Sequence, residues 1–336
     1  MKLPFHCSVM SLGRFLILFT LLSSSSIFSI RAESGPESAN VSQVKTITLE
    51  PVDAKRARKV PIKIYLTPSK EVKPVIVFSH GLGGSRDGNP YLGNHWAKNG
   101  YAVVFVQHAG SDRAVWESVA PAERMNALKK AAGVQAAIDR LFDIPFILDQ
   151  LEKWNADESH ELSSKLDLDH IGMCGHSFGA VTTMGLVGQK YPGDFSMPER
   201  RFDAFLPMSP QPAIGRSPKE SFGHLGLPIL CMTGTKDGSP IDPTMKPEKR
   251  REVFEASPEG DKFQLVLEGA DHFVFSDGGG IISTPRNPNH HPVILETSTR
   301  FWDAYLKGDS SAKAWLQSDA PGKIEAMASE DVWEWK

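Results

Sequence analysis

The residues best suited to chemistry lie in the middle of the chain, where positions 175–179 read Gly-His-Ser-Phe-Gly, a G-x-S-x-G motif. A short apolar run, 170–173, comes before the motif, and a helix-compatible stretch, 180–189, follows it. A strand, a sharp turn and a helix, with the serine in the turn, form the arrangement called a nucleophile elbow. The flanking glycines lack a Cβ, so the turn closes without a clash. Ser177 is therefore the predicted nucleophile.

A serine hydroxyl becomes a good nucleophile only when a base removes its proton and an acid orients that base. In an elbow of this kind the chain order is serine, acid, histidine. Asp237 and His272 each follow a short apolar run, so both fall in loops at strand ends. We expect His272 to accept the proton and Asp237 to hold the imidazole. Asp271 is a rival acid, although a residue adjacent to the base would struggle to reach its ring.

A glycine-rich loop is a second feature with chemical meaning. Residues 80–84 read His-Gly-Leu-Gly-Gly and follow the continuous apolar run 74–79. Small residues let the backbone turn so that its N–H groups face the site. We predict that the N–H groups of Leu82 and Phe178 form an oxyanion hole. A generic glycine turn is the alternative.

Strands and helices that alternate along the chain must position these loops. Runs 44–49 and 60–66 alternate in polarity and predict an antiparallel pair at one sheet edge. Buried strands are expected at 74–79, 101–106, 202–208, 228–233 and 263–267, and helical segments near 94–99, 180–189, 247–256 and 292–306. This alternation predicts an α/β fold, with a mostly parallel central sheet and helices on both faces.

The segment 110–139 is long, polar and helical. It leaves the end of a central strand, where active sites of open α/β sheets form, so we expect it to cover the site in part. Asp143 is expected to cap the next helix, with Pro145 in its first turn. The interval 208–227 is too short for a separate cap domain, which favours an open pocket.

Composition and the N-terminal residues narrow the classes of function. The chain has 336 residues, a formal charge of -3 and no long basic run, so no nucleic-acid partner is expected. Residues 1–32 combine basic residues, a short apolar core and a serine cluster, which is typical of a signal peptide. Residues 33–43 are predicted to be a flexible linker and residues 44–336 a single domain. We therefore expect export to a periplasmic or extracellular location, with no stable membrane span after cleavage; an uncleaved anchor is the alternative.

Histidines and cysteines outside these motifs receive structural interpretations. His290 and His291 are expected to be solvated at a helix start, since no acid or cysteine completes a metal site; neither a metal nor a cofactor is predicted. Cys174 and Cys231 fall on strands separated by a third, too far apart for a disulfide at about 4.8 Å per strand. His108 ends a central strand, where it either lines the pocket or supports the structure.

The motifs together resemble the α/β-hydrolase superfamily. More narrowly, the chain is similar to predicted dienelactone hydrolases and platelet-activating-factor acetylhydrolase-like serine esterases, which border on polyester-cleaving cutinases. The likeness covers roughly residues 60–306 and rests on positions 78–84, 106–112, 140–151, 175–179, 234–237 and 269–273.

This resemblance implies the α/β-hydrolase fold and a serine hydrolase, which the signal peptide predicted at residues 1–32 would export. It would cleave a small-molecule or lipid-like carboxylic ester through an acyl-enzyme, without a cofactor. Dienelactone hydrolases use a cysteine where this chain has Ser177, and the acetylhydrolases and cutinases commonly have a glycine where it has Ala180. The family therefore guides the reaction better than the substrate.

Two other functions stay open. The same residues would serve an amide or peptide hydrolase, and a catalytically silent binding protein is the less favoured third reading. Because His272 must be neutral to act as a base, activity is expected to fall on acidification through about pH 6–7. The oligomeric state is not fixed by the sequence.

Overall fold

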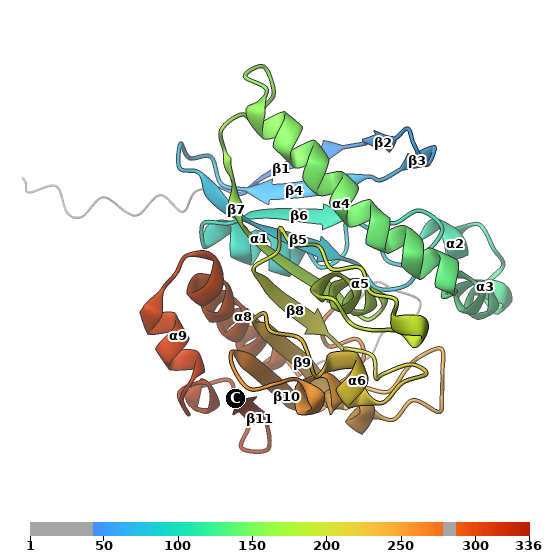
Figure 1. Ribbon diagram of the computed structural model, residues 1–336, viewed down its shortest axis with the longest axis vertical. Coiled ribbons are helices and arrows are strands. Elements are labelled where there is room, and N and C mark those ends of the chain that lie inside the picture. The colour runs from blue at the N-terminus through green and yellow to red at the C-terminus, as the bar shows by residue number, and fades with distance from the viewer. Residues whose placement is uncertain (1–42, 278–286) are drawn as a thin grey trace, which may run out of the picture. The chain divides into compact units, whose positions relative to one another are not determined.

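A nine-stranded sheet lies at the centre of the computed structural model, which describes residues 43–277 and 287–336 (Figure 1). The strand order is β1-β4-β6-β5-β7-β8-β9-β10-β11. These strands are β1 (Lys45–Leu49), β4 (Ile62–Leu66), β5 (Lys73–Ser79), β6 (Ala102–Val106), β7 (Leu166–His176), β8 (Ala204–Met208), β9 (Ile229–Lys236), β10 (Lys262–Asp271) and β11 (Val332–Trp335). The run from β6 to β10 is parallel, and β1, β4 and β11 pair antiparallel at the two edges.

Helices cover both faces of this sheet (Figure 1). Val75 and Val77 of β5 pack with α4 and α5 on one face, and Ile76 and Phe78 pack with α1 and α8 on the other. Burial on two faces explains why the central strands are continuous apolar runs. The helices are α1 (Pro90–Lys98), α2 (Ala114–Glu117), α3 (Arg124–Ala131), α4 (Val134–Ala156), α5 (Phe178–Val187), α6 (Pro218–Phe222), α7 (Glu252–Ala256), α8 (His290–Leu306) and α9 (Ser310–Leu316). The predicted fold class is confirmed.

Short elements complete the described part of the chain. A separate two-stranded sheet joins β2 (Val52–Asp53) to β3 (Arg58–Lys59). The 3-10 turns are η1 (Pro121–Glu123), η2 (Pro192–Asp194), η3 (Pro247–Arg251) and η4 (Pro321–Lys323). None of the helices in residues 43–277 and 287–336 is long and apolar enough to cross a membrane.

The prediction that Asp143 caps a helix is wrong. Helix α4 already begins at Val134, so Asp143 and Pro145 both lie in its interior. The Asp143 carboxylate is fully buried, where it accepts hydrogen bonds from Arg58 and His108. Proline removes one backbone donor, but the apolar face of α4 packs against the sheet and carries the helix across it.

The compact unit that holds the sheet runs from Val41 to Lys336. The predicted signal peptide (1–32) lies outside the described residues, as does the predicted linker (33–43) except for its last residue. Those boundaries stay predictions.

Candidate active site

Ser177 lies in a sharp turn between the end of β7 and the start of α5. Its backbone is held at φ 58° and ψ -112°, a conformation that residues with a side chain rarely adopt. The neighbouring glycines make this turn possible, because a Cβ on Gly175 would overlap the backbone of Gly179, and one on Gly179 would overlap the carbonyl of Ser79. The motif therefore forms the nucleophile-elbow geometry that its sequence predicts.

The structure brings Ser177, His272 and Asp237 together in one hydrogen-bonded chain. His272 Nε2 lies 2.8 Å from Ser177 Oγ, and His272 Nδ1 lies 2.7 Å from Asp237 Oδ1. The loops after β9 and β10 supply the acid and the histidine, at the sheet edge where β7 also ends. Asp271, the rival acid, instead accepts the backbone N–H of Phe273 at 2.9 Å. The catalytic roles of the three residues remain predictions at this point.

The hydrogen bonds of this chain fix where the protons lie. A carboxylate only accepts, so His272 Nδ1 donates to Asp237 and Nε2 is free to accept the Ser177 hydroxyl proton. Thr233 Oγ1 donates to the second carboxylate oxygen at 2.8 Å. Burial opposes ionisation of Asp237, but the bond from His272 and the charge of Arg250 outweigh it and lower its pKa. Asp237 is therefore an anion at neutral pH.

The two predicted oxyanion donors are well placed to receive a ligand. Leu82 and Phe178 both line the cavity into which Ser177 opens. Phe178 is the first residue of α5, so its N–H has no partner within the helix. Neither amide donates to a backbone carbonyl of residues 43–277 or 287–336. Two N–H groups beside the serine are thus available to an anion.

The cavity above Ser177 has a volume of about 1110 Å³. The segment 110–139 forms one wall, as expected of a partial cover. Its apolar lining includes Trp116, Met125, Leu128, Ala137 and Ile138. Pockets for drug-sized ligands occupy about 300–1,000 Å³, so this space accepts more than a small ester.

The interpretation of His290 as a solvated helix-start residue is wrong. His290 is 6% exposed, and its Nε2 lies 3.1 Å from the carbonyl oxygen of Glu268, which holds the ring against the end of β10. His291 Nε2 similarly contacts the Val274 carbonyl at 2.9 Å. Within residues 43–277 and 287–336, no group of three or more histidine, cysteine, aspartate or glutamate side chains is placed to hold a metal ion.

Of the remaining predictions, the one for the two cysteines is confirmed, and the structure decides between the two roles left open for His108. Cys174 and Cys231 are free and buried on β7 and β9, with β8 between them, as predicted. His108 is fully buried and supports the structure instead of lining the cavity. His176 packs beside the elbow, with its ring 4.9 Å from that of His272.

Two buried arginines near the site were not predicted from the sequence. Arg250 Nε lies 3.4 Å from Asp237 Oδ1, and its Nη1 donates to the carbonyl of Ser209 at 3.0 Å. Arg140 lies on α4, fully buried beneath the loop 80–84. Arg140 is the first residue of 140–151, one of the stretches that carry the family resemblance. This resemblance is the sequence signal that could have identified Arg140. Arg250 lies in a run of charged residues that is typical of a solvated face.

The fold and the elbow define the α/β-hydrolase class. Residues 42–137 match the model of a family described as platelet-activating factor acetylhydrolase, isoform II. This match confirms the resemblance to acetylhydrolase-like esterases that the sequence motifs indicated. It supports a hydrolase of the lipase or esterase type.

Proposed function

We propose that the protein is an exported serine esterase that hydrolyses carboxylic esters through an acyl-enzyme on Ser177. The observation that carries this proposal is the hydrogen-bonded chain in which His272 Nε2 lies 2.8 Å from Ser177 Oγ and Nδ1 lies 2.7 Å from Asp237. The serine is thereby joined to a base, and the base to an anion. The N-terminal residues 1–32 support export through their composition alone.

Acylation begins when the Ser177 hydroxyl proton moves to His272 Nε2 and Oγ bonds to the ester carbonyl carbon. The carbonyl oxygen becomes an oxyanion that accepts the N–H groups of Leu82 and Phe178. The C–O bond to the alcohol then breaks, and the proton on Nε2 passes to the leaving oxygen. Water repeats the sequence on the acyl-enzyme, losing its proton to His272 and releasing the acid as Ser177 recovers its own. Each step conserves protons between the substrate and these side chains.

The proposed substrate class is a lipid-like ester with a sizeable apolar part. The matched family is named after an acetylhydrolase of platelet-activating factor. The apolar wall formed by residues 110–139 and the cavity of about 1110 Å³ support such a substrate here. Burial of apolar surface contributes about 25 cal/mol per Å² to binding, so longer chains gain affinity until the wall is covered.

The test compares Ser177→Ala with Ser257→Ala, whose buried hydroxyl donates to the Val253 carbonyl at 2.6 Å, away from the cavity. We expect Ser177→Ala to lower turnover of p-nitrophenyl butyrate by about 10⁴ or more, and Ser257→Ala to retain it. A fluorophosphonate should add one label to the wild type and none to Ser177→Ala, as read by intact mass. Retained turnover in Ser177→Ala would sink the proposal. Faster cleavage of a matched amide than of its ester would instead make the protein an amidase, and no turnover of either would leave a binding protein.

A further inference from the structure

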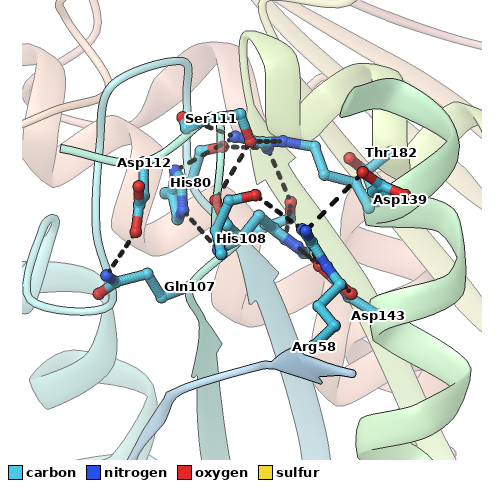
Figure 2. Close-up of polar contacts among 12 residues, drawn as sticks. Arg58, His80, Gln107, His108, Ser111, Asp112, Asp139, Asp143 and Thr182 are labelled. Carbon is cyan, nitrogen blue, oxygen red and sulfur yellow. Dashed lines mark hydrogen bonds and ion pairs between the residues drawn. The ribbon is translucent and has the colours of Figure 1, made fainter. Parts of the chain in front are cut away.

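A buried polar cluster lies beneath the loop 80–84, and the proposed mechanism does not use it (Figure 2). Ser79 Oγ lies 2.9 Å from His108 Nε2, and His108 Nδ1 lies 2.9 Å from Asp143 Oδ2. None of the three side chains reaches solvent. The cluster thus repeats the serine–histidine–aspartate order of the active site, but no substrate can reach its hydroxyl.

His80 connects this cluster to the loop. The backbone N–H of His108 donates to His80 Nε2 at 3.1 Å. A backbone N–H can only donate, so Nε2 carries no proton and the ring hydrogen lies on Nδ1. His80 Nδ1 therefore donates to the carbonyl oxygen of Gly81, which lies 2.6 Å away. Figure 2 shows the His80 and His108 side chains next to each other.

The Gly81 carbonyl belongs to the same peptide unit as the Leu82 N–H. A trans peptide is planar, with its C=O and N–H pointing in opposite directions. When the His80 ring holds the carbonyl, it also directs the Leu82 N–H away from the ring. The Gly84 N–H donates to the same carbonyl at 3.0 Å and closes the turn. Gly81 lies against the nucleophile, since a Cβ built on it would be 3.5 Å from Ser177 Cβ.

Arg140 fixes the backbone of His80 by a hydrogen bond. Its Nη1 donates to the His80 carbonyl at 2.7 Å, and its Nε donates to Ser111 Oγ at 2.9 Å. Its guanidinium carbon lies 4.4 Å from the ring centre of Phe178, the residue that bears the second oxyanion donor. One buried cation therefore contacts Phe178, which bears one predicted oxyanion donor, and His80, which lies next to the peptide that bears the other.

The same cation acts on the protonation of His80. Arg140 Nη2 lies 3.3 Å from His80 Nδ1, so a positive charge on the His80 ring would be repelled by the guanidinium. Burial is the largest cause, and together with the charges of Arg140 and His108 it holds the pKa of His80 well below its usual value. The ring stays neutral, with its single proton directed at the Gly81 carbonyl.

We propose that His80 is a positioning residue that directs the Leu82 N–H at the oxyanion, that the His108 N–H fixes its tautomer, and that Arg140 keeps His80 in place and uncharged. This inference rests on the proposed serine esterase function. The inference assigns the positioning role to one ring nitrogen, Nδ1. An experiment can therefore distinguish this role from a purely structural role of the whole ring.

Two isosteric variants separate the ring nitrogens. An asparagine amide at position 80 places its N–H near Nδ1, and a glutamine amide places its polar atoms near Nε2. Loss of an oxyanion donor lowers kcat by about 10²–10³. A misdirected donor should therefore lower kcat in His80→Gln by about 10- to 100-fold, with KM little changed, while His80→Asn keeps most of the activity. His95→Asn is the matched control, because His95 contacts Thr299 at 3.1 Å and does not line the cavity.

A trifluoromethyl ketone, whose adduct with Ser177 carries an oxyanion, gives a second readout. Its affinity should fall in His80→Gln by the same factor as kcat/KM and stay near the wild-type value in His80→Asn. A larger loss in His80→Asn than in His80→Gln, or equal losses in both, would overturn the role of Nδ1. Ser177→Ala tests the underlying function separately. Retained activity in that variant would refute the serine esterase function itself, and not only the positioning role of His80.

The tautomer itself can be read in the unaltered protein. Nitrogen chemical shifts of ¹⁵N-histidine-labelled enzyme distinguish a protonated from an unprotonated ring nitrogen. We expect His80 to be protonated on Nδ1 alone at pH 7. Protonation on Nε2, or on both nitrogens, would overturn the proposal even if the position-80 variants failed to fold.

Discussion

Arg250 and Asp237 form an ion pair from which water is excluded: the Arg250 Nε lies 3.4 Å from Asp237 Oδ1, and both side chains are 0% exposed. The same guanidinium donates to the Ser209 carbonyl at 3.0 Å and to the Gly238 carbonyl at 3.2 Å. Arg250 thereby fastens the loop that carries the acid to the end of β8. A buried carboxylate without such a partner would bear its full desolvation cost.

Removing Arg250 should therefore destabilise the fold. Breaking a buried ion pair at one partner costs about 3–5 kcal/mol, so Arg250→Met should lower the free energy of unfolding by about that amount. Urea denaturation followed by circular dichroism measures it. Arg251→Met is the matched control, because Arg251 pairs with Glu334 at a partly exposed site, where such a pair contributes at most about 1 kcal/mol. Equal losses in the two variants would contradict the assignment.

The choice of Asp237 over Asp271 gives a kinetic prediction. Asp237→Asn should lower kcat by about 10⁴, because an amide at this position favours the wrong tautomer of His272. Asp271→Asn should keep kcat close to that of the wild type, since the Asp271 carboxylate accepts the Phe273 N–H and, among the residues that the structure describes, makes no hydrogen bond to the His272 ring. Initial rates on p-nitrophenyl butyrate compare them. The reverse order of activities would make Asp271 the acid.

The features of this protein that could be predicted are those that a short stretch of sequence determines. The elbow, the order serine–acid–histidine and the continuous apolar strands are each visible within a few residues. The edge strand β11 was not predicted, because only four residues, Val332–Trp335, form it. Pro145 read as a helix start because a proline is tolerated in the first turn, whereas the packed face of α4 carries the helix through it.

The buried arginines were beyond sequence reasoning for a different reason. The partners that justify burying Arg250 are the carbonyls of Ser209 and Pro210, some forty positions earlier in the chain. Only the pairing of β8 with β9 brings these atoms together. In the sequence, Arg250 stands between Lys249 and Arg251 and has the composition of a solvated surface. Local composition does not reveal a hydrogen-bond partner that only the tertiary fold brings close.

The contact between α5 and β5 predicts a severe effect of one added methyl group. Gly179→Ala would drive a Cβ into the Ser79 carbonyl, where backbone on both sides leaves no room to relax. We expect the free energy of unfolding to fall by at least about 3 kcal/mol. Gly226→Ala is the control, since a Cβ there meets no atom within 4 Å, and a surface change of this kind stays within about 0.5 kcal/mol. Chemical denaturation of both variants decides, and similar stabilities would refute the close approach.

The buried His108 makes stability fall as the pH falls. Burial, followed by the charge of Arg140, lowers the pKa of His108 to about 4 in the folded protein, against 6.5 for a free histidine. Between these values the unfolded chain binds a proton that the folded protein does not, so unfolding is favoured as the pH drops from 6.5 towards 4. One proton corresponds to a slope of about 1.4 kcal/mol per pH unit.

His108→Asn keeps a donor near Asp143 and removes this titration, so its free energy of unfolding should vary less steeply with pH between 4.5 and 6. Urea denaturation at several pH values gives both slopes. The exposed His170 provides a control of opposite sign, because its hydrogen bond to Asp167 raises its pKa. The folded protein then holds the proton more tightly, a contribution that is present at low pH and lost as the pH rises. His170→Asn should accordingly leave the slope unchanged or slightly steeper; a slope that flattens in His170→Asn and not in His108→Asn would show that the buried ring is not the group that titrates.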